Sequence, residues 1–313
     1  MTTANPARVS GLPQLHGRQF VTDGGMETDL IFHHGVDLPY FAAFPLLDRS
    51  EGRALLERYY DGYANIAAAA GAGLLLESPT WRANQDWGRQ LGYDAAELAR
   101  INTAAIAELA RLRNRYSTTI PAILVSGMIG PRGDGYSATE QLDADQATEY
   151  HRPQLAAFAS AGADMASAYT LTHIGEAIGI VRAAREVGIP VAISFTVETD
   201  GRLPSGTPLA EAITIVDETA SPEYFLVNCA HPAHIEPALA LAGRWRERIV
   251  GLRINASPLS HAELDEAEKL DEGDIPALTA AHDRLADHLP SLTIVGGCCG
   301  TDARHVRALW KAG

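Results

Sequence analysis

LTIVGGCCGTD, residues 292–302, lies near the end of the 313-residue chain. Its first residues, Leu292 to Val295, are apolar and partly β-branched, which is typical of a buried strand. Thr301 and Asp302 then predict a helix N-terminus, and a helix is expected through about Trp310. Two adjacent thiols, Cys298 and Cys299, therefore lie on a glycine-rich turn between a strand and a helix.

The rest of the chain alternates strands with helices in the same way. This alternation predicts an α/β protein, a single (β/α)8 TIM barrel over residues 1–313, with residues 1–16 as a flexible tail. An open doubly wound sheet is the alternative, but no glycine fingerprint follows the first strand. Strands are expected at 19–22, 74–76, 123–126, 164–169, 190–197, 224–228, 249–254 and 292–296, and helices at 48–70, 94–115, 143–161, 176–187, 209–219, 237–245, 276–288 and 301–310.

Composition restricts the class of protein. The chain is 46% hydrophobic and 20% charged, so a sizeable core is expected. Its net charge of −14 argues against a nucleic-acid partner. The apolar stretch at 66–76 is too short to span a bilayer, and residues 1–14 lack the apolar segment of a signal peptide. We therefore expect a cytoplasmic protein without a membrane partner, either a monomer or a small homo-oligomer.

The three cysteines of the chain all follow predicted strands. Cys229 ends the run Tyr224–Asn228, and Cys298 and Cys299 follow the eighth strand. In a closed barrel these strand ends meet at one mouth, where three thiolates and an open position would suit catalytic Zn2+. The alternative is that Cys229 is a small buried hydrophobe and that Cys298 and Cys299 form a redox-active or inert pair.

Several motifs carry a family resemblance over nearly the whole chain. They are DGGMET at 23–28, GPRG at 130–133, HRP at 151–153, NC at 228–229 and GGCCGT at 296–301. With these motifs the chain resembles the homocysteine S-methyltransferase family, zinc-dependent thiol methyltransferases on a (β/α)8 barrel. The resemblance implies that Cys229, Cys298 and Cys299 bind Zn2+, and that Asp23, with Gly24 and Gly25, lies beside the amino-acid substrate.

The resemblance also implies a reaction. A methyl group would move from a small sulfonium or ammonium donor, such as S-methylmethionine, to a thiol acceptor, homocysteine or a related thiol. Bound zinc would let that thiol react as a thiolate at neutral pH. Asp23 ends the strand beside the Cys298 strand, so we expect a catalytic role, with Asp23→Asn lowering turnover far more than it lowers stability. Glu198, just after the fifth strand, is a candidate contact to the methyl donor.

Some positions depart from the family pattern. Tyr169 stands where the family usually has a glutamate that holds the substrate's ammonium group. The second strand end carries Glu77, Thr80 and Arg82, which we expect to contact substrate, as we do Tyr169. Either Glu77 supplies the lost carboxylate, or the natural substrate pair differs from that of the family. Two asparagines, Asn228 and Asn255, are also expected to line the mouth.

Two functions of other classes stay open from the sequence. A metal-dependent hydrolase would use a histidine set such as His231 and His234, but these lie in a proline-containing loop and no His-x-His pair follows the first strand. A redox- or zinc-responsive binding protein would use the adjacent thiols without turnover. The acidic segment 263–274 is expected to be an exposed loop or helix.

Overall fold

Eight parallel strands form a closed barrel in the computed structural model, which describes residues 11–136, 142–267 and 269–312. Each strand pairs with the next and β1 pairs with β8, so the predicted (β/α)8 TIM barrel is confirmed and the open sheet is excluded. The strands are β1 (Phe20–Val21), β2 (Gly73–Glu77), β3 (Ile123–Ile129), β4 (Met165–Leu171), β5 (Val191–Phe195), β6 (Tyr224–Asn228), β7 (Ile249–Ile254) and β8 (Ile294–Gly297).

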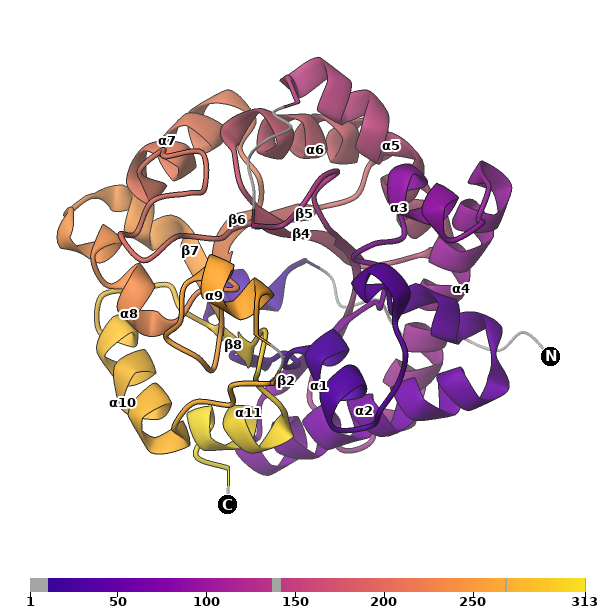
Figure 1. Ribbon diagram of the computed structural model, residues 1–313, viewed down its shortest axis with the longest axis horizontal. Helices are drawn as coiled ribbons and strands as arrows, with labels where there is room; N and C mark the ends of the chain where they lie inside the picture. Colours follow the sequence, from indigo (N-terminus) through magenta and orange to yellow (C-terminus); the bar gives the residue numbers. More distant parts are fainter. Residues whose placement is uncertain (1–10, 137–141, 268, 313) are drawn as a thin grey trace.

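The helices form a ring around this barrel (Figure 1). Two of the long outer helices begin at acidic caps that the sequence supplies: Asp94 and Asp143 each form a capping box with the residue three positions later. The helices are α1 (Met26–Phe32), α2 (Ser50–Ala70), α3 (Gln85–Gln90), α4 (Ala95–Tyr116), α5 (Ala144–Ala161), α6 (Ile174–Val187), α7 (Leu209–Thr219), α8 (Pro232–Ile235), α9 (His261–Asp265), α10 (Ile275–Ala286) and α11 (Ala303–Leu309).

Most expected bounds differ from the observed ones by a few residues, and two elements differ for a clear physical reason. The helix expected over 237–245 is absent, and two short 3-10 turns, Ala238–Ala240 and Arg244–Arg248, take its place. Pro237 and Gly243 confine the apolar run between them, which leaves too few residues for a stable helix. The third strand continues past the expected boundary to Ile129, because Gly127 packs against the ring of Phe158 instead of forming a turn.

The segment before β1 is also different from the flexible tail expected through residue 16. Pro13–His16 is a 3-10 helix, and the side chains of Leu12 and Gln14 are buried. Gln14 donates from Nε2 to the hydroxyl of Tyr224 at 3.3 Å, and its carbonyl accepts from Thr293 Oγ1 at 3.0 Å. This segment closes the amino-terminal end of the barrel. Residues 1–10 lie outside the described part of the chain.

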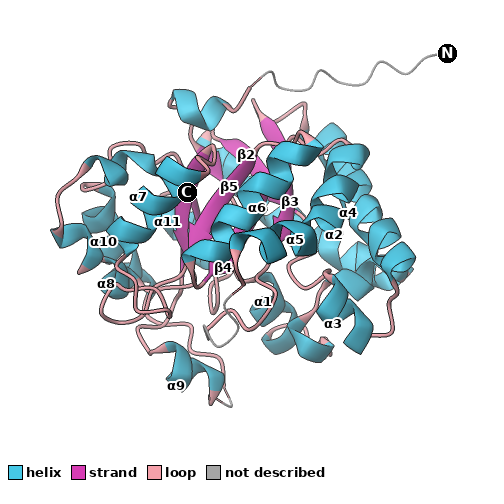
Figure 2. Ribbon diagram, turned by 90° about the horizontal axis from the view of Figure 1, so that it is seen from above, coloured by secondary structure: helices cyan, strands magenta, loops and turns pink. Residues whose placement is uncertain are grey.

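The opposite end of the barrel carries the short helices that follow individual strands. α1, α3, α8 and α9 come after β1, β2, β6 and β7, and α9 projects from this end in Figure 2. Buried side chains such as Phe20, Leu124 and Leu226 fill the barrel interior, so a cavity can open only above them. Within the described residues, every helix is too short or too polar to cross a membrane.

Candidate active site

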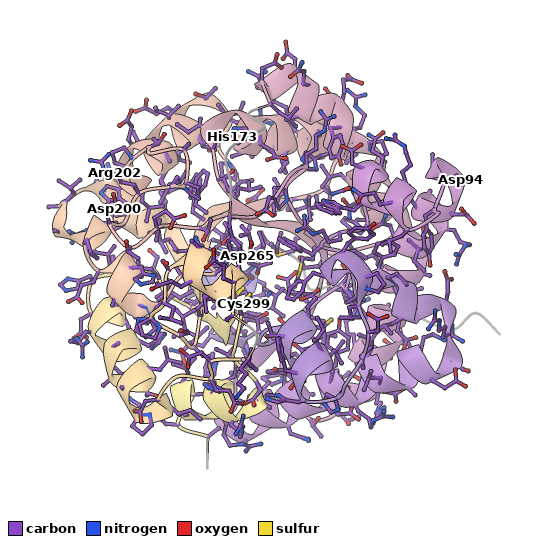
Figure 3. The ribbon with its side chains drawn as sticks, in the orientation of Figure 1. Asp94, His173, Asp200, Arg202, Asp265 and Cys299 are labelled. Carbon is purple, nitrogen blue, oxygen red and sulfur yellow. The ribbon has the colours of Figure 1, made fainter. Side chains whose placement is uncertain are left out.

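The three cysteines converge at the carboxyl ends of β6 and β8. Their sulfur atoms all lie within 4.8 Å of one another, and the sulfurs of Cys229 and Cys299 are 3.4 Å apart. All three thiols are free, and Cys299 lies toward the middle of the ring in Figure 3. Three sulfurs around a tetrahedral zinc ion at about 2.3 Å would lie about 3.8 Å from one another. The spacing and the soft donor set therefore fit such an ion.

The backbone around the thiols is held in unusual conformations. Cys229 has a φ of 56° and the β-branched Thr170 a φ of 63°, both in the left-handed region. Asn228, the last residue of β6, binds residues of β4 and β5. Its Oδ1 accepts from the Thr170 amide at 2.9 Å and from Ser194 Oγ at 2.6 Å. Its Nδ2 faces the sulfur of Cys298 at 3.8 Å. Asn228 therefore fixes the thiols as well as lining the cavity.

Glycine is required where α1 approaches the cysteine turn. A side-chain carbon at Gly25 would lie 2.5 Å from the carbonyl oxygen of Cys298, and one at Gly24 would lie 2.9 Å from the carbonyl oxygen of Thr301. Both positions line the cavity, as the sequence predicts. The DGG motif thus serves to bring the start of α1 against the thiol turn.

Tyr136 and His261 cover the thiols, and the sequence analysis missed both. The Tyr136 hydroxyl lies 3.2 Å from the sulfur of Cys229 and 3.3 Å from that of Cys299. Its ring stacks on His261 at a centroid distance of 4.3 Å, and His261 Nε2 donates to the carbonyl oxygen of Cys229 at 2.7 Å. Burial raises the pKa of Tyr136, so its hydroxyl stays protonated. Only the tertiary structure brings these residues together, from a glycine-rich loop and an acidic segment.

Glu198 lies behind His261. Its Oε1 is 3.1 Å from His261 Nδ1, and it does not line the cavity. The predicted contact with the methyl donor is therefore not supported, because Glu198 pairs with His261 and is not part of the cavity wall. Glu198 orients the imidazole that holds Cys229.

Asp23 lines the cavity but is already paired. Its Oδ1 lies 2.5 Å from the buried guanidinium of Arg253, and its Oδ2 accepts from the Tyr59 hydroxyl at 3.2 Å. Burial raises the pKa of Asp23, and the positive charge of Arg253 opposes that rise. Arg253 also donates to the carbonyl oxygens of Gly24 and Gly297, so this pair joins β1, β7 and β8 below the thiols. Asp23 therefore has a structural role in addition to its place in the cavity wall.

Tyr169 separates Glu77 from the cavity. The Tyr169 ring packs against Arg253, whose guanidinium carbon is 4.8 Å from the ring centroid. The Tyr169 hydroxyl donates to Glu77 Oε1 at 2.8 Å. Glu77 is fully buried, its Oε2 has no partner among the described residues, and burial raises its pKa to about 7. Tyr169 lines the cavity and Glu77 does not, so a direct substrate contact by Glu77 is not supported.

Two further predicted contacts are also absent from the cavity wall. Thr80 is buried and donates to the carbonyl oxygen of Met128 at 2.7 Å, and Asn255, the residue after β7, is buried as well. Both are polar residues that follow a strand, which is why the sequence favoured them. Position after a strand does not fix which way a side chain points, and neither side chain reaches the cavity wall.

Arg82 does line the cavity, at the place where β2 leads into α3. Its guanidinium carbon lies 4.2 Å from the ring centroid of Trp81 and 4.0 Å from that of Trp87. It donates from one terminal nitrogen to the carbonyl oxygen of Gly133 at 2.9 Å, whereas its buried Nε has no partner among the described residues. Two indole faces therefore hold a cation rigidly in the wall.

The cavity has a volume of about 350 Å³. One wall is apolar and consists of thioether and aromatic side chains: Met26, Phe32, Phe41, Trp81 and Met128. The acidic segment after β7, expected to be simply exposed, supplies the outer wall through Leu264, Asp265, Leu270 and Asp271. The apolar leucines within that acidic run were the available signal for this role.

Glu27 is a further cavity residue that the sequence analysis quoted only as part of a motif. It lies in the first turn of α1 and lines the cavity. Burial raises its pKa from 4.5 to about 7, and the nearby charges of Asp23 and Cys298 raise it as well. The carboxylate forms no ion pair with any described residue.

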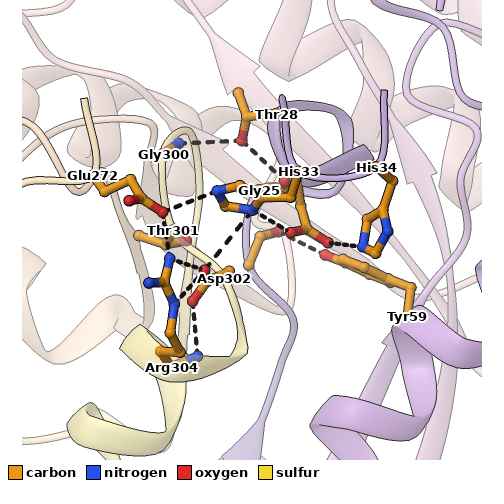
Figure 4. A network of polar contacts seen from close by, with 12 residues as sticks. Gly25, Thr28, His33, His34, Tyr59, Glu272, Gly300, Thr301, Asp302 and Arg304 are labelled. Atoms are coloured by element: carbon orange, nitrogen blue, oxygen red, sulfur yellow. Dashed lines mark hydrogen bonds and ion pairs between the residues drawn. The ribbon is translucent and has the colours of Figure 1, made fainter. Parts of the chain in front are cut away.

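A second group of metal-type ligands lies outside the cavity (Figure 4). Ligand atoms of Asp29, His33 and Asp302 lie within 4.8 Å of one another. Arg304 binds Asp302 and Glu272 there, and Glu272 Oε1 is 2.9 Å from His33 Nε2. The network joins three parts of the chain: α1, the start of α11, and the segment that precedes α10. A guanidinium already supplies the positive charge that a metal ion would bring.

Comparisons with known proteins agree with this architecture. The family model described as homocysteine S-methyltransferase matches residues 20–312. Homocysteine S-methyltransferase YbgG of Bacillus subtilis (strain 168) is 26% identical over 310 residues, which is 92% of each chain. Homocysteine S-methyltransferase of Escherichia coli (strain K12) is 25% identical over 244 residues, 70% of this chain and 73% of its own.

A solved structure gives the same fold. The homocysteine methyltransferase MmuM from Escherichia coli, in its metallated form, superposes with a TM-score of 0.68 at 21% identity. The match covers 95% of this chain and 96% of that one.

Proposed function

Because the chain belongs to the homocysteine S-methyltransferase family, a family of methyltransferases, we propose that it binds Zn2+ through Cys229, Cys298 and Cys299 and transfers a methyl group to the thiol of homocysteine or a related thiol. The observation that carries the proposal is the convergence of three free thiols within 4.8 Å at the floor of one cavity. The proposed donor is a small onium compound such as S-methylmethionine.

Zinc held by the three thiolates would act as a Lewis acid that lets an acceptor thiol react as a thiolate at neutral pH. The transfer forms a bond between acceptor sulfur and methyl carbon. The bond from that carbon to the donor's onium atom breaks, and its electron pair stays with the departing neutral product. The acceptor's thiol proton leaves to solvent.

The residues of this chain would position the two substrates. The thioether and aromatic wall of Met26, Phe41 and Met128 would exclude water from a methylated onium group. Tyr136, stacked on His261, would cover the thiols and keep the reacting atoms out of bulk solvent. Asn228 would hold the Cys229 and Cys298 turns in register.

A direct test combines metal content with product analysis. The purified protein is expected to hold about one zinc per chain and to methylate homocysteine with S-methylmethionine, followed by mass spectrometry. Cys298→Ser should lose both properties, whereas His33→Asn, in the second ligand group outside the cavity, should keep both. Zinc retained in Cys298→Ser would contradict the three-thiolate site, and a redox-responsive protein would show no methylated product.

A further inference from the structure

Glu27 is one of five acids that line this cavity, and it lies in the first turn of α1 next to the thiol turn, whereas Asp265 is exposed on the outer wall. Asp23 is neutralised by Arg253 at 2.5 Å. Two outer-wall acids are also engaged: Asp134 accepts from the Tyr136 amide, and Asp271 accepts from Ser257 Oγ at 2.6 Å. Glu27 forms no ion pair with any described residue.

Glu27 lies close to the thiol turn at which the methyl transfer is proposed to occur. It follows Gly25 by two residues, and Gly25 packs directly against the Cys298 carbonyl. The charge of Glu27 is within range of Cys298 on one side and of Arg82 on the other. Glu27 thus lines the same cavity as the thiol cluster and Arg82, in the turn of α1 that packs against Cys298.

A partly buried carboxylate without a cation is costly in the empty protein. Burial and the charges of Asp23 and Cys298 oppose its ionisation, and its own backbone hydrogen bond and the charge of Arg253 offset only part of this cost. A bound ligand with a positive charge would remove that cost. Tyr169, at the end of β4, offers only a neutral ring and hydroxyl to the same cavity, and its hydroxyl is turned toward Glu77.

We propose that Glu27 binds the α-ammonium group of the acceptor thiol, so that the enzyme selects a thiol amino acid over the same thiol without an amino group. This inference rests on the proposed function, because the thiol cluster defines where the acceptor's sulfur lies. In a homocysteine-like acceptor the nitrogen is about 5 Å from the sulfur in the extended chain. The ammonium can therefore reach a side chain that borders the cluster without touching it.

The test compares homocysteine with 4-mercaptobutanoate, which has the same chain without the amino group. Wild-type protein is expected to favour homocysteine in kcat/KM, and Glu27→Gln should lower that value about 10- to 100-fold while changing 4-mercaptobutanoate by less than about 3-fold. Glu27→Asp, which keeps the charge on a shorter side chain, should recover part of the preference. Calorimetric binding of homocysteine without donor should weaken in Glu27→Gln in parallel.

Several outcomes would overturn the assignment. A homocysteine preference that persists in Glu27→Gln would do so, as would a loss that falls equally on both thiols or on the KM of the methyl donor. A melting temperature no lower than that of the wild type would show that Glu27→Gln folds. If no thiol is methylated but homocysteine binding still depends on Glu27, the proposed function fails and the ammonium site stands.

Discussion

Two groups of metal-type ligands lie at the same end of this barrel, and they differ in how their charge is balanced. Cys229, Cys298 and Cys299 contact one another, Tyr136 and Asn228, all of which can be neutral. Asp29, His33 and Asp302 lie equally close together, but Arg304 binds Asp302. The comparison teaches that proximity of ligands does not make a metal site: the group without an internal cation is the one that can accept an ion.

The largest expected effect is on the thiol group. Cys298→Ser should reduce zinc to well below one per chain and lower turnover by more than about 100-fold, because loss of even an outer partner of a metal ligand costs about 10- to 100-fold. Atomic absorption and the methyl-transfer assay measure the two effects. Normal zinc content in this variant would mean that the thiol group is not the metal site.

Asp23 shares a feature with each of the two ligand groups. It borders the thiols, and it is paired with a cation as Asp302 is. Asp23→Asn leaves the Arg253 guanidinium buried without its carboxylate, which should lower the free energy of unfolding by about 3–5 kcal/mol. Urea denaturation measures this loss. The double variant Asp23→Asn with Arg253→Met should recover much of it, and an unchanged stability in the single variant would mean that the ion pair contributes nothing.

Asp302→Asn should affect stability and leave the metal in place. The variant loses the ion pair with Arg304, whereas the asparagine oxygen can still cap α11, so the change should cost about 1 kcal/mol. Hydrogen bonding to His305 and Arg304 lowers the pKa of Asp302 despite its burial, so its contribution is present above pH 4 and lost as the pH falls further. Thermal unfolding at pH 3 and pH 7 checks the sign. Loss of zinc in this variant would show that the second group is coupled to the first.

The smallest expected effect concerns Glu27 in the absence of substrate. Burial raises its pKa to about 7 from an unfolded value near 4.5, so its stabilising contribution is complete below pH 4.5 and is lost as the pH rises through 7. Asp23, Cys298, Arg253 and Arg82 are the charged or titratable groups that act on it.

Glu27→Gln should therefore match the wild type in stability near pH 4.5 and exceed it by about 1 kcal/mol at pH 8, since the partial exposure of the side chain reduces the effect. Melting curves at the two pH values measure the difference. A variant less stable than wild type at pH 8 would mean that the carboxylate has a partner in the folded protein.

The sequence predicted the parts of this molecule that depend on local pattern. Apolar runs with a period suited to strands and helices, acidic caps and glycine turns gave the barrel and nearly all of its boundaries, since these signals act within a few residues. The prediction failed over 237–245 and over 11–16. In the second case the burial of Leu12 and Gln14 depends on the barrel end that they close.

The thiol group was also predictable from the sequence, because strand-end position alone brings Cys229 and Cys298 to one mouth once the barrel closes. Which side chains face the cavity was decided only by the tertiary structure. Glu77 and Glu27 are both acids beside a strand end, yet Tyr169 binds the first whereas the second, after the turn at Gly25, lines the cavity. The direction of a side chain at the end of a strand depends on packing against distant segments, and no local pattern encodes it.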